Sequence, residues 1–157
     1  MMEIKNMNKV NKGGIAATGT VVMTEEVYIN DIAVLEGKNG IYIDMSYSYK
    51  SGDEWKKTNY AVPVSPEAHA EIMAAVQEAI DNGKMRAVST EKRPTLKGYV
   101  NIKAKNVSIR VSFTDKGQVI TPSRQYEKNG ETKYAHYVGI SKEQAESIAE
   151  AFKAAMD

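Results

Sequence analysis

The feature that most restricts the fold of this chain is an internal similarity between its two halves. In each half, segments with strand-like alternation lead into an amphipathic segment with helical periodicity. Ser65 precedes the first helical segment, and Ser141-Lys142-Glu143-Gln144 opens the second with the spacing of a capping box. When Ser65 is aligned with Ser141, apolar residues of the first half match apolar residues of the second at a constant distance along the chain. Upstream of the helices the matches continue once the alignment is shifted by one residue. The matched pairs are Val62 and Val138, Val64 and Ile140, Ile72 and Ile148, Val76 and Phe152, Gly40 and Gly117, Ile43 and Ile120, Tyr49 and Tyr126, Ile32 and Ile109, and Val34 and Val111.

This pattern predicts an α+β fold with two similar units, residues 1–83 and 84–157, each a β-sheet followed by a C-terminal helix. The alternative to duplication is that two segments resemble each other only because they share a β-β-β-α pattern. In the second unit, the alternation of apolar residues favours a hairpin turn at Lys105-Asn106. The expected strands are 4–10, 15–23, 27–35 and 41–49 in the first unit, and 85–88, 99–104, 107–113 and 119–126 in the second.

Composition narrows the possible functions. The chain has no cysteine, which removes disulfides, thiol nucleophiles and thiolate metal sites. Its first residues are polar and no apolar run is long enough to span a bilayer, so we expect a cytoplasmic protein without membrane contact. The net charge of +1 hides an asymmetry: residues 1–80 hold 7 Lys and Arg against 11 Asp and Glu, whereas residues 81–157 hold 14 against 9. The second half is therefore the cationic one.

The amino-acid sequence of the first half resembles one known family. The segments that carry the likeness are Lys9-Val10-Asn11, Val27 to Gly37, Asn39 to Met45, Asp53-Glu54 and Ala61-Val62-Pro63-Val64. Together they resemble the stage V sporulation protein G family, also called septation protein, over nearly all of the first unit. The resemblance implies small sheet-plus-helix subunits that form dimers and bind DNA or RNA as regulators, without enzymatic activity. In this chain the two units would then pair with each other as an intramolecular pseudo-dimer.

The same resemblance directs attention to a basic pair that follows Met-Pro-Ser in the family. In the first unit Met45 is followed by Ser46-Tyr47-Ser48-Tyr49, so the pair is missing and Lys50 is the nearest cation. In the second unit Pro122-Ser123-Arg124-Gln125 retains one of the two charges. We therefore expect the second unit to carry most of the nucleic-acid binding.

Basic residues concentrate in the second half, where residues 84–133 hold 12 Lys and Arg against 4 Asp and Glu. On strands, Lys103 and Lys105 share one face, and Arg110 alternates with apolar neighbours, so a cationic sheet face is available. Such a face either binds along the phosphate backbone of a nucleic acid or is the solvated side of the sheet, opposite the core. The candidate nucleic-acid-binding residues are Arg124, Gln125, Lys128, Lys133, Arg110, Lys103, Lys105, Lys50, Lys56 and Lys57.

Aromatic residues cluster with lysines around the two expected long hairpins. They suit stacking on unpaired bases, and equally suit cross-strand pairs that hold a hairpin together. Of these residues, Trp55 is the one expected to be partly exposed. The cluster comprises Tyr47, Tyr49, Trp55, Tyr60, Tyr126, Tyr134 and Tyr137.

The residue patterns give no basis for catalysis. No Ser-His-Asp arrangement, phosphate loop or set of metal ligands is evident, and we expect neither a cofactor nor a metal. The leading hypothesis is a DNA- or RNA-binding regulator that acts as a covalently linked pseudo-dimer. The alternative is a protein-binding module, such as an inhibitor or adaptor of phage or mobile-element origin, because tyrosine-rich surfaces also suit protein interfaces.

Overall fold

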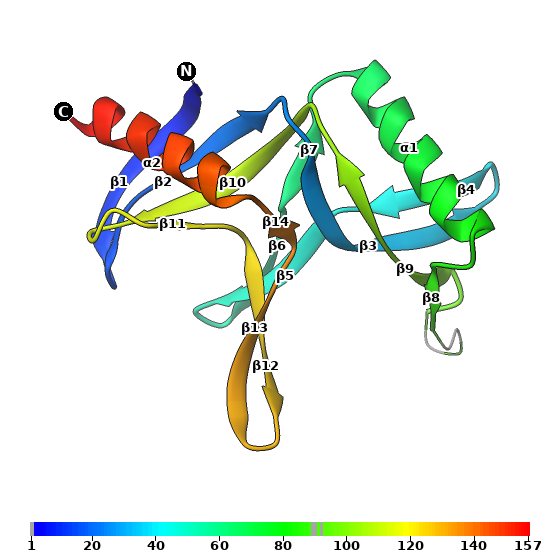
Figure 1. The fold of residues 1–157 in the computed structure, drawn as a ribbon. Coiled ribbons are helices and arrows are strands. Elements are labelled where there is room, and N and C mark those ends of the chain that lie inside the picture. Colours follow the sequence, from blue (N-terminus) through cyan, green and yellow to red (C-terminus); the bar gives the residue numbers. More distant parts are fainter. Residues whose placement is uncertain (1, 89–90, 92) are drawn as a thin grey trace.

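A computed structural model describes residues 2–88, 91 and 93–157, and within these residues it contains fourteen strands and two helices (Figure 1). The first half contains β1 (Ile4–Lys12), β2 (Ile15–Met23), β3 (Val27–Gly37), β4 (Gly40–Asp44), β5 (Ser46–Ser51), β6 (Glu54–Asn59), β7 (Ala61–Pro63) and α1 (Pro66–Asp81). The second half contains β8 (Arg86–Ala87), β9 (Leu96–Ala104), β10 (Val107–Thr114), β11 (Val119–Ile120), β12 (Ser123–Lys128), β13 (Glu131–His136), β14 (Val138–Gly139) and α2 (Lys142–Met156). The order of elements is the same in both halves, and the expected α+β class is confirmed.

The two larger sheets each contain strands from both halves. In one sheet the order is β1-β2-β10-β11, with β7 also paired to β10. In the other the order is β8-β9-β3-β14, with β4 also paired to β3. Each pairing in the first sheet thus has its counterpart in the second, and all of these pairs are antiparallel. The halves are interlocked, since the central pairs β2-β10 and β9-β3 both join one half to the other.

The turn expected at Lys105-Asn106 is present, but the strands that flank it do not form a hairpin. Asn106 has the left-handed φ of 58°, which Asn tolerates better than most residues. From this turn β9 pairs with β3 and β10 pairs with β2, so the chain passes from one sheet to the other. Alternation correctly predicts which residues face the core, but it does not identify the partner strand.

The helices cover the sheets and close one hydrophobic core, to which both halves contribute. Helix α1 packs on β9 of the other half, and α2 packs on β1 and β11. On α2, Phe152 is fully buried and its ring stacks on Phe113 of β10 with centroids 5.2 Å apart. The predicted capping box is confirmed, because Ser141 Oγ accepts from the Gln144 N–H at 3.1 Å and Gln144 Oε1 accepts from the Ser141 N–H at 2.9 Å. No helix among the described residues is long and apolar enough to cross a membrane.

Two glycines occupy corresponding places in the two sheets. Gly19 of β2 lies opposite Val111, and Gly98 of β9 lies opposite Val34, which is the residue aligned with Val111. A Cβ atom on Gly98 would lie 2.5 Å from the carbonyl oxygen of Arg86, so only glycine lets β8 approach β9 this closely. The glycines are slightly farther apart in the chain than the other matched pairs, so an alignment at constant separation overlooks their match.

Candidate nucleic-acid interface

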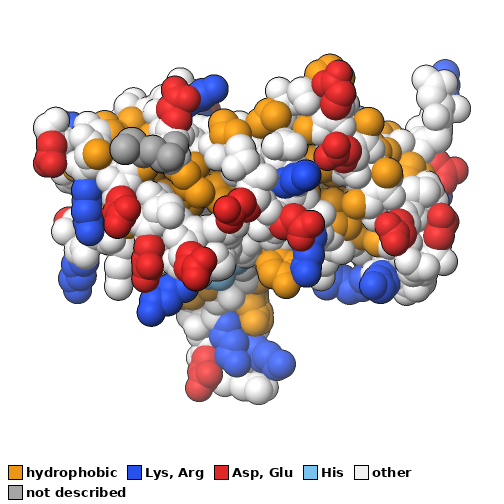
Figure 2. All heavy atoms as spheres, turned by 45° about the horizontal axis from the view of Figure 1, so that its top comes forward, with side chains coloured by type: hydrophobic (Ala, Val, Ile, Leu, Met, Phe, Trp, Pro, Cys, Tyr) orange, Lys and Arg blue, Asp and Glu red, His pale blue; other side chains and the backbone are white. Residues whose placement is uncertain are grey.

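Two hairpins, β5-β6 and β12-β13, extend downward from the sheets in Figure 1 and are corresponding elements of the two halves. Each is a separate two-stranded sheet. The β12-β13 turn is Asn129-Gly130, and both residues have positive φ, as a tight hairpin turn of this kind requires. In Figure 2, basic and acidic side chains are mixed over the body, and the part that projects below it carries mainly basic side chains with an acidic one beside them.

Each hairpin presents an exposed tyrosine directly opposite a lysine. Tyr49 pairs with Lys56, and Tyr126 pairs with Lys133. Residues that face each other in an antiparallel pair lie on the same side of the hairpin, so the tyrosine and lysine of each pair share one face. On β12 the Arg124 guanidinium lies on this face as well, 5.8 Å from the Tyr126 ring centroid. The two tyrosines are 41% and 37% exposed, and the two pairs occupy corresponding positions of the two halves. The expected exposure of Trp55 is confirmed at 72%, although these tyrosines are exposed as well.

Other tyrosines connect the bases of the hairpins. Tyr60 and Tyr137, which are corresponding residues of the two halves, stack on each other with centroids 4.5 Å apart, and Tyr47 stacks on Tyr137 at 5.5 Å. The backbone N–H of Tyr60 donates to the Met45 carbonyl at 3.0 Å, and that of Tyr137 donates to the Pro122 carbonyl at 2.8 Å. Burial raises the pKa of both phenols, so they are neutral at physiological pH. These three rings therefore pack on one another and connect the bases of the two hairpins, which is the structural alternative to stacking on bases.

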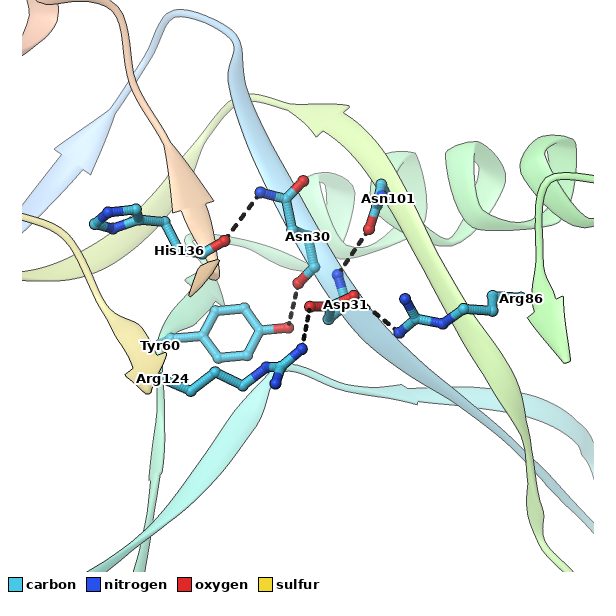
Figure 3. Close-up of polar contacts among 7 residues, drawn as sticks. All are labelled: Asn30, Asp31, Tyr60, Arg86, Asn101, Arg124 and His136. Carbon is cyan, nitrogen blue, oxygen red and sulfur yellow. Dashed lines mark hydrogen bonds and ion pairs between the residues drawn. The ribbon is translucent and has the colours of Figure 1, made fainter. Parts of the chain in front are cut away.

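Between the hairpin bases lies a cavity of about 530 Å³, here named the arginine cleft, with Asp31, Arg86, Arg93 and Arg124 in its lining. Asp31 lies at a bulge of β3 in the left-handed conformation, with φ of 55°. Its carboxylate accepts from Arg86 Nη2 at 3.1 Å and lies 3.7 Å from Arg124 Nη2 (Figure 3). Its backbone N–H donates to Asn101 Oδ1 at 2.8 Å, which fixes the bulge. One carboxylate thus orients two guanidinium groups, which come from β8 and β12 of the second half.

The residue before Asp31 ties the same bulge to the hairpins. The carbonyl oxygen of Asn30 accepts from the Tyr60 hydroxyl at 3.3 Å, and the Asn30 side-chain amide donates to the His136 carbonyl at 3.0 Å (Figure 3). Hydrogen bonds of this kind each contribute about 1 kcal/mol. The bulge, the tyrosine stack and the end of β13 are therefore held in one arrangement.

A second ion pair lies at the edge of the cleft. Lys57 Nζ donates to Asp44 Oδ2 at 2.9 Å, and the Ser46 hydroxyl also donates to this carboxylate. Burial acts to raise the pKa of Asp44, but the hydrogen bonds from Lys57 and Ser46 together outweigh it and leave this pKa below its ordinary value. Among the described residues, no group of three or more His, Cys, Asp and Glu side chains could hold a metal ion.

Seven of the ten predicted binding residues lie on the hairpins, and two of these reach the arginine cleft. Arg124 and Lys57 line the cleft. Gln125 donates to the Tyr134 hydroxyl at 3.1 Å on the other face of β12-β13. The remaining hairpin residues, all exposed, are Lys50, Lys56, Lys128 and Lys133.

The other three predicted residues do not form the expected cationic sheet face. Lys103 lies on β9 with its ammonium 5.3 Å from the Tyr28 ring centroid, and Lys105 lies in the turn that follows β9. Arg110 is on β10, in the other sheet, and donates to Thr58 Oγ1 at 3.0 Å. The predicted cationic face required β9 and β10 to pair as one hairpin. Because the chain passes from one sheet to the other between these strands, Arg110 is separated from Lys103 and Lys105.

Residue patterns alone overlooked much of the arginine cleft. Arg86 and Arg93 belong to the basic region of the second half, but nothing in that region indicates that they approach Arg124. The polar pair Asn30-Asp31, which interrupts the apolar alternation of β3, was the available signal for a bulge. Lys92, another cation of the region, lies outside the described residues.

No solved structure matches the chain. The SpoVG family matches residues 1–82, which is slightly more than half of the 157 residues. The match covers the first half, including β3, the β5-β6 hairpin and all of α1. This chain therefore belongs to the SpoVG family.

Proposed function

We propose that this protein is a nucleic-acid-binding regulator that acts by binding, not catalysis, and that its two halves arose by duplication and form a covalently linked pseudo-dimer. The observation that carries the proposal is the repeated hairpin, with an exposed tyrosine beside a lysine at corresponding positions of both halves. A ring that stacks on a base and a cation that contacts the adjacent phosphate are the two parts of a single-strand binding surface.

The interlocked sheets support the pseudo-dimer. The resemblance to sporulation protein G implies two subunits per functional unit, and here both central strand pairs join one half to the other. Covalent linkage makes such an association intramolecular, with an effective concentration on the order of millimolar for a short linker. Assembly would then not depend on the concentration of the protein.

The division of charge supports unequal roles for the halves. The second half is the more cationic overall, although the two hairpins have the same local balance: each has three basic residues against two acidic ones. Contact with phosphates releases counterions, so binding through the second half should weaken steeply as salt rises. We propose that β12-β13 contributes more to affinity than β5-β6.

The test is a fluorescence-anisotropy titration of labelled single-stranded DNA, double-stranded DNA and single-stranded RNA at several salt concentrations. Replacing Tyr126 and Lys133 with alanine should weaken single-strand binding about 5- to 150-fold, because stacking contributes about 1–3 kcal/mol per base. The matched variant Tyr49→Ala with Lys56→Ala should have a smaller effect. Lys116→Ala, on the exposed turn before β11, is the control for loss of charge away from the hairpins.

Two results would refute the proposal. One is the absence of binding to any of the three nucleic acids at low salt. The other is unchanged affinity when both tyrosine-lysine pairs are removed together. In that case the exposed aromatic residues, including Trp55 and Tyr134, would favour the protein-binding alternative, since such residues are enriched at protein interfaces.

A further inference from the structure

We propose that the arginine cleft binds a terminal phosphate monoester, either at the end of a nucleic-acid strand or on a free nucleotide. This inference deepens the proposed function and rests on it for the nature of the ligand. It concerns a site other than the tyrosine-lysine faces of the hairpins, because the cleft lies at the hairpin bases.

The balance of charge in the cleft matches such a group. Lys57 and Asp44 neutralise each other through their contact at 2.9 Å. The remaining charged residues of the lining are three arginines and Asp31, and Arg86 and Arg124 both contact this carboxylate. Two positive charges are therefore left without a protein counterion among the described residues that line the cleft. A phosphate monoester carries about −1.5 to −2 at pH 7, whereas an internal phosphodiester carries about −1. A terminal phosphate is therefore the better match.

The geometry leaves the arginines able to bind a second anion. A guanidinium group has five N–H donors in a rigid fork. Arg86 and Arg124 each approach Asp31 through one terminal nitrogen, so most of their donors remain for a ligand. Because Asp31 is itself fixed by Asn101, the two forks are held in place before the ligand arrives, which lowers the entropic cost of binding.

The size and walls of the cleft suit a nucleotide. A volume of about 530 Å³ lies within the range of small-molecule sites. Tyr47, Tyr99 and Tyr137 form part of the wall and give the cleft an aromatic lining. Tyr47 and Tyr137 stack on each other and Arg86 lies over the Tyr99 ring, so a base would contact the parts of these rings that remain uncovered. The Ser46 and Ser48 hydroxyls, at the start of β5, line the same space and can donate to or accept from a sugar or phosphate.

The other half of the molecule provides an internal comparison. A smaller cavity of about 230 Å³ at the related position is lined by Arg110, Thr121 and Ser123, and the last two correspond to Asp44 and Ser46 of the first half. Among the described residues, Arg110 is the one cation in its lining. Where the arginine cleft has Asp31 and Asp44, the related positions are Ser108 and Thr121. The phosphate site is thus expected once per chain.

The experiment compares two versions of one short single-stranded oligonucleotide, labelled at its 3′ end, with a 5′-phosphate or a 5′-hydroxyl. The phosphorylated version should bind about tenfold more tightly, since charge-assisted contacts from arginine are strong and directional. Arg86→Ala with Arg93→Ala should bring this ratio close to one. Arg110→Ala, in the smaller cavity, is the matched control and should leave the ratio unchanged. All three arginines are exposed, and thermal melting would verify that each variant is folded.

Competition distinguishes the sources of the phosphate. Displacement of the phosphorylated oligonucleotide by adenosine monophosphate would support a site that accepts free nucleotides, and displacement by inorganic phosphate alone would support a site that recognises only the phosphate. Equal affinity for the two oligonucleotides together with no arginine-dependent binding of the nucleotide would overturn the inference.

The two proposals can fail separately. Tyr126→Ala with Lys133→Ala should weaken both oligonucleotides equally and preserve their ratio. If neither oligonucleotide binds but the nucleotide binds in an Arg86- and Arg93-dependent manner, the proposed function fails and the phosphate site remains. If both oligonucleotides bind equally and the nucleotide does not bind, the phosphate site fails and the proposed function remains.

Discussion

Removal of the Phe152 ring tests whether the interlocked halves unfold as one unit. Phe152 belongs to α2, near the end of the second half, yet its fully buried ring stacks on Phe113 and lies beside β2 of the first half. Phe152→Ala therefore opens a cavity between strands that come from both halves. If the sheets are as interlocked as their pairing indicates, the first half should lose as much stability as the second.

The size of the effect follows from the complete burial of the ring. A buried Phe→Ala change costs about 3–5 kcal/mol. That is a large part of the roughly 5–15 kcal/mol that stabilises a typical domain. For a chain of this length each kcal/mol lowers Tm by about 2–4 °C, so we expect Tm to fall by about 6–20 °C. Glu150→Ala, at an exposed position of α2, is the control and should change stability by less than about 0.5 kcal/mol.

Thermal melting by circular dichroism gives the change in Tm, and amide hydrogen exchange shows which strands lose protection. Cooperative unfolding predicts one transition and equal loss of protection in β3 and β10, which lie in different halves and different sheets. Two separate transitions, or a β3 that stays protected while β10 exchanges, would refute the reasoning and show that residues 1–83 fold independently.

Two further changes test the cleft and its edge. Gly98→Ala places a Cβ atom 2.5 Å from the Arg86 carbonyl oxygen, so β8 must move. We expect calorimetry to show a loss of about 1–3 kcal/mol in the free energy of unfolding, and binding assays to show a smaller preference for the 5′-phosphate. An unchanged preference would contradict the role given to Arg86. The folded-state pKa of Asp44 lies below the ordinary value of 3.8, so its ion pair stabilises the fold above that pH and loses its contribution as pH falls through the folded pKa. In urea unfolding from pH 7 to pH 2, the stability difference between wild type and Asp44→Asn should therefore shrink on the acid side, whereas parallel curves would exclude this contribution.

Residue patterns predicted the elements of this fold better than their pairing. The Ser141 capping box and the core-facing residues of β10 depend on neighbours a few positions away, so their spacing reveals them. The partner of β10 depends on contacts with β2, which lies far earlier in the chain, and alternation is the same whichever strand it meets. Exchange of strands between the halves was therefore outside what periodicity can show.

The candidate site likewise has one part that the sequence predicts and one part that it does not. Lysines and tyrosines of the hairpins lie close together in sequence, and tight turns bring them face to face, so their clustering was predictable. The arginine cleft instead depends on a bulge at Asp31 that meets Arg86 and Arg124 from distant segments. Only the tertiary structure brings those charges together.

The two related cavities explain how one fold can have unequal halves. In a dimer of identical chains, any residue that improves one cavity appears in both, because symmetry repeats every substitution. Under the proposed duplication, covalent linkage removes that requirement: Asp31 and its counterpart Ser108, or Asp44 and Thr121, differ while the sheets around them keep the same pairing. The stacked pair of Tyr60 and Tyr137 has the same residue in both halves, and each ring packs on the other. Tyr47, which also stacks on Tyr137, corresponds instead to Arg124, so one half uses this position for the tyrosine stack and the other half uses it to supply a charge to the arginine cleft.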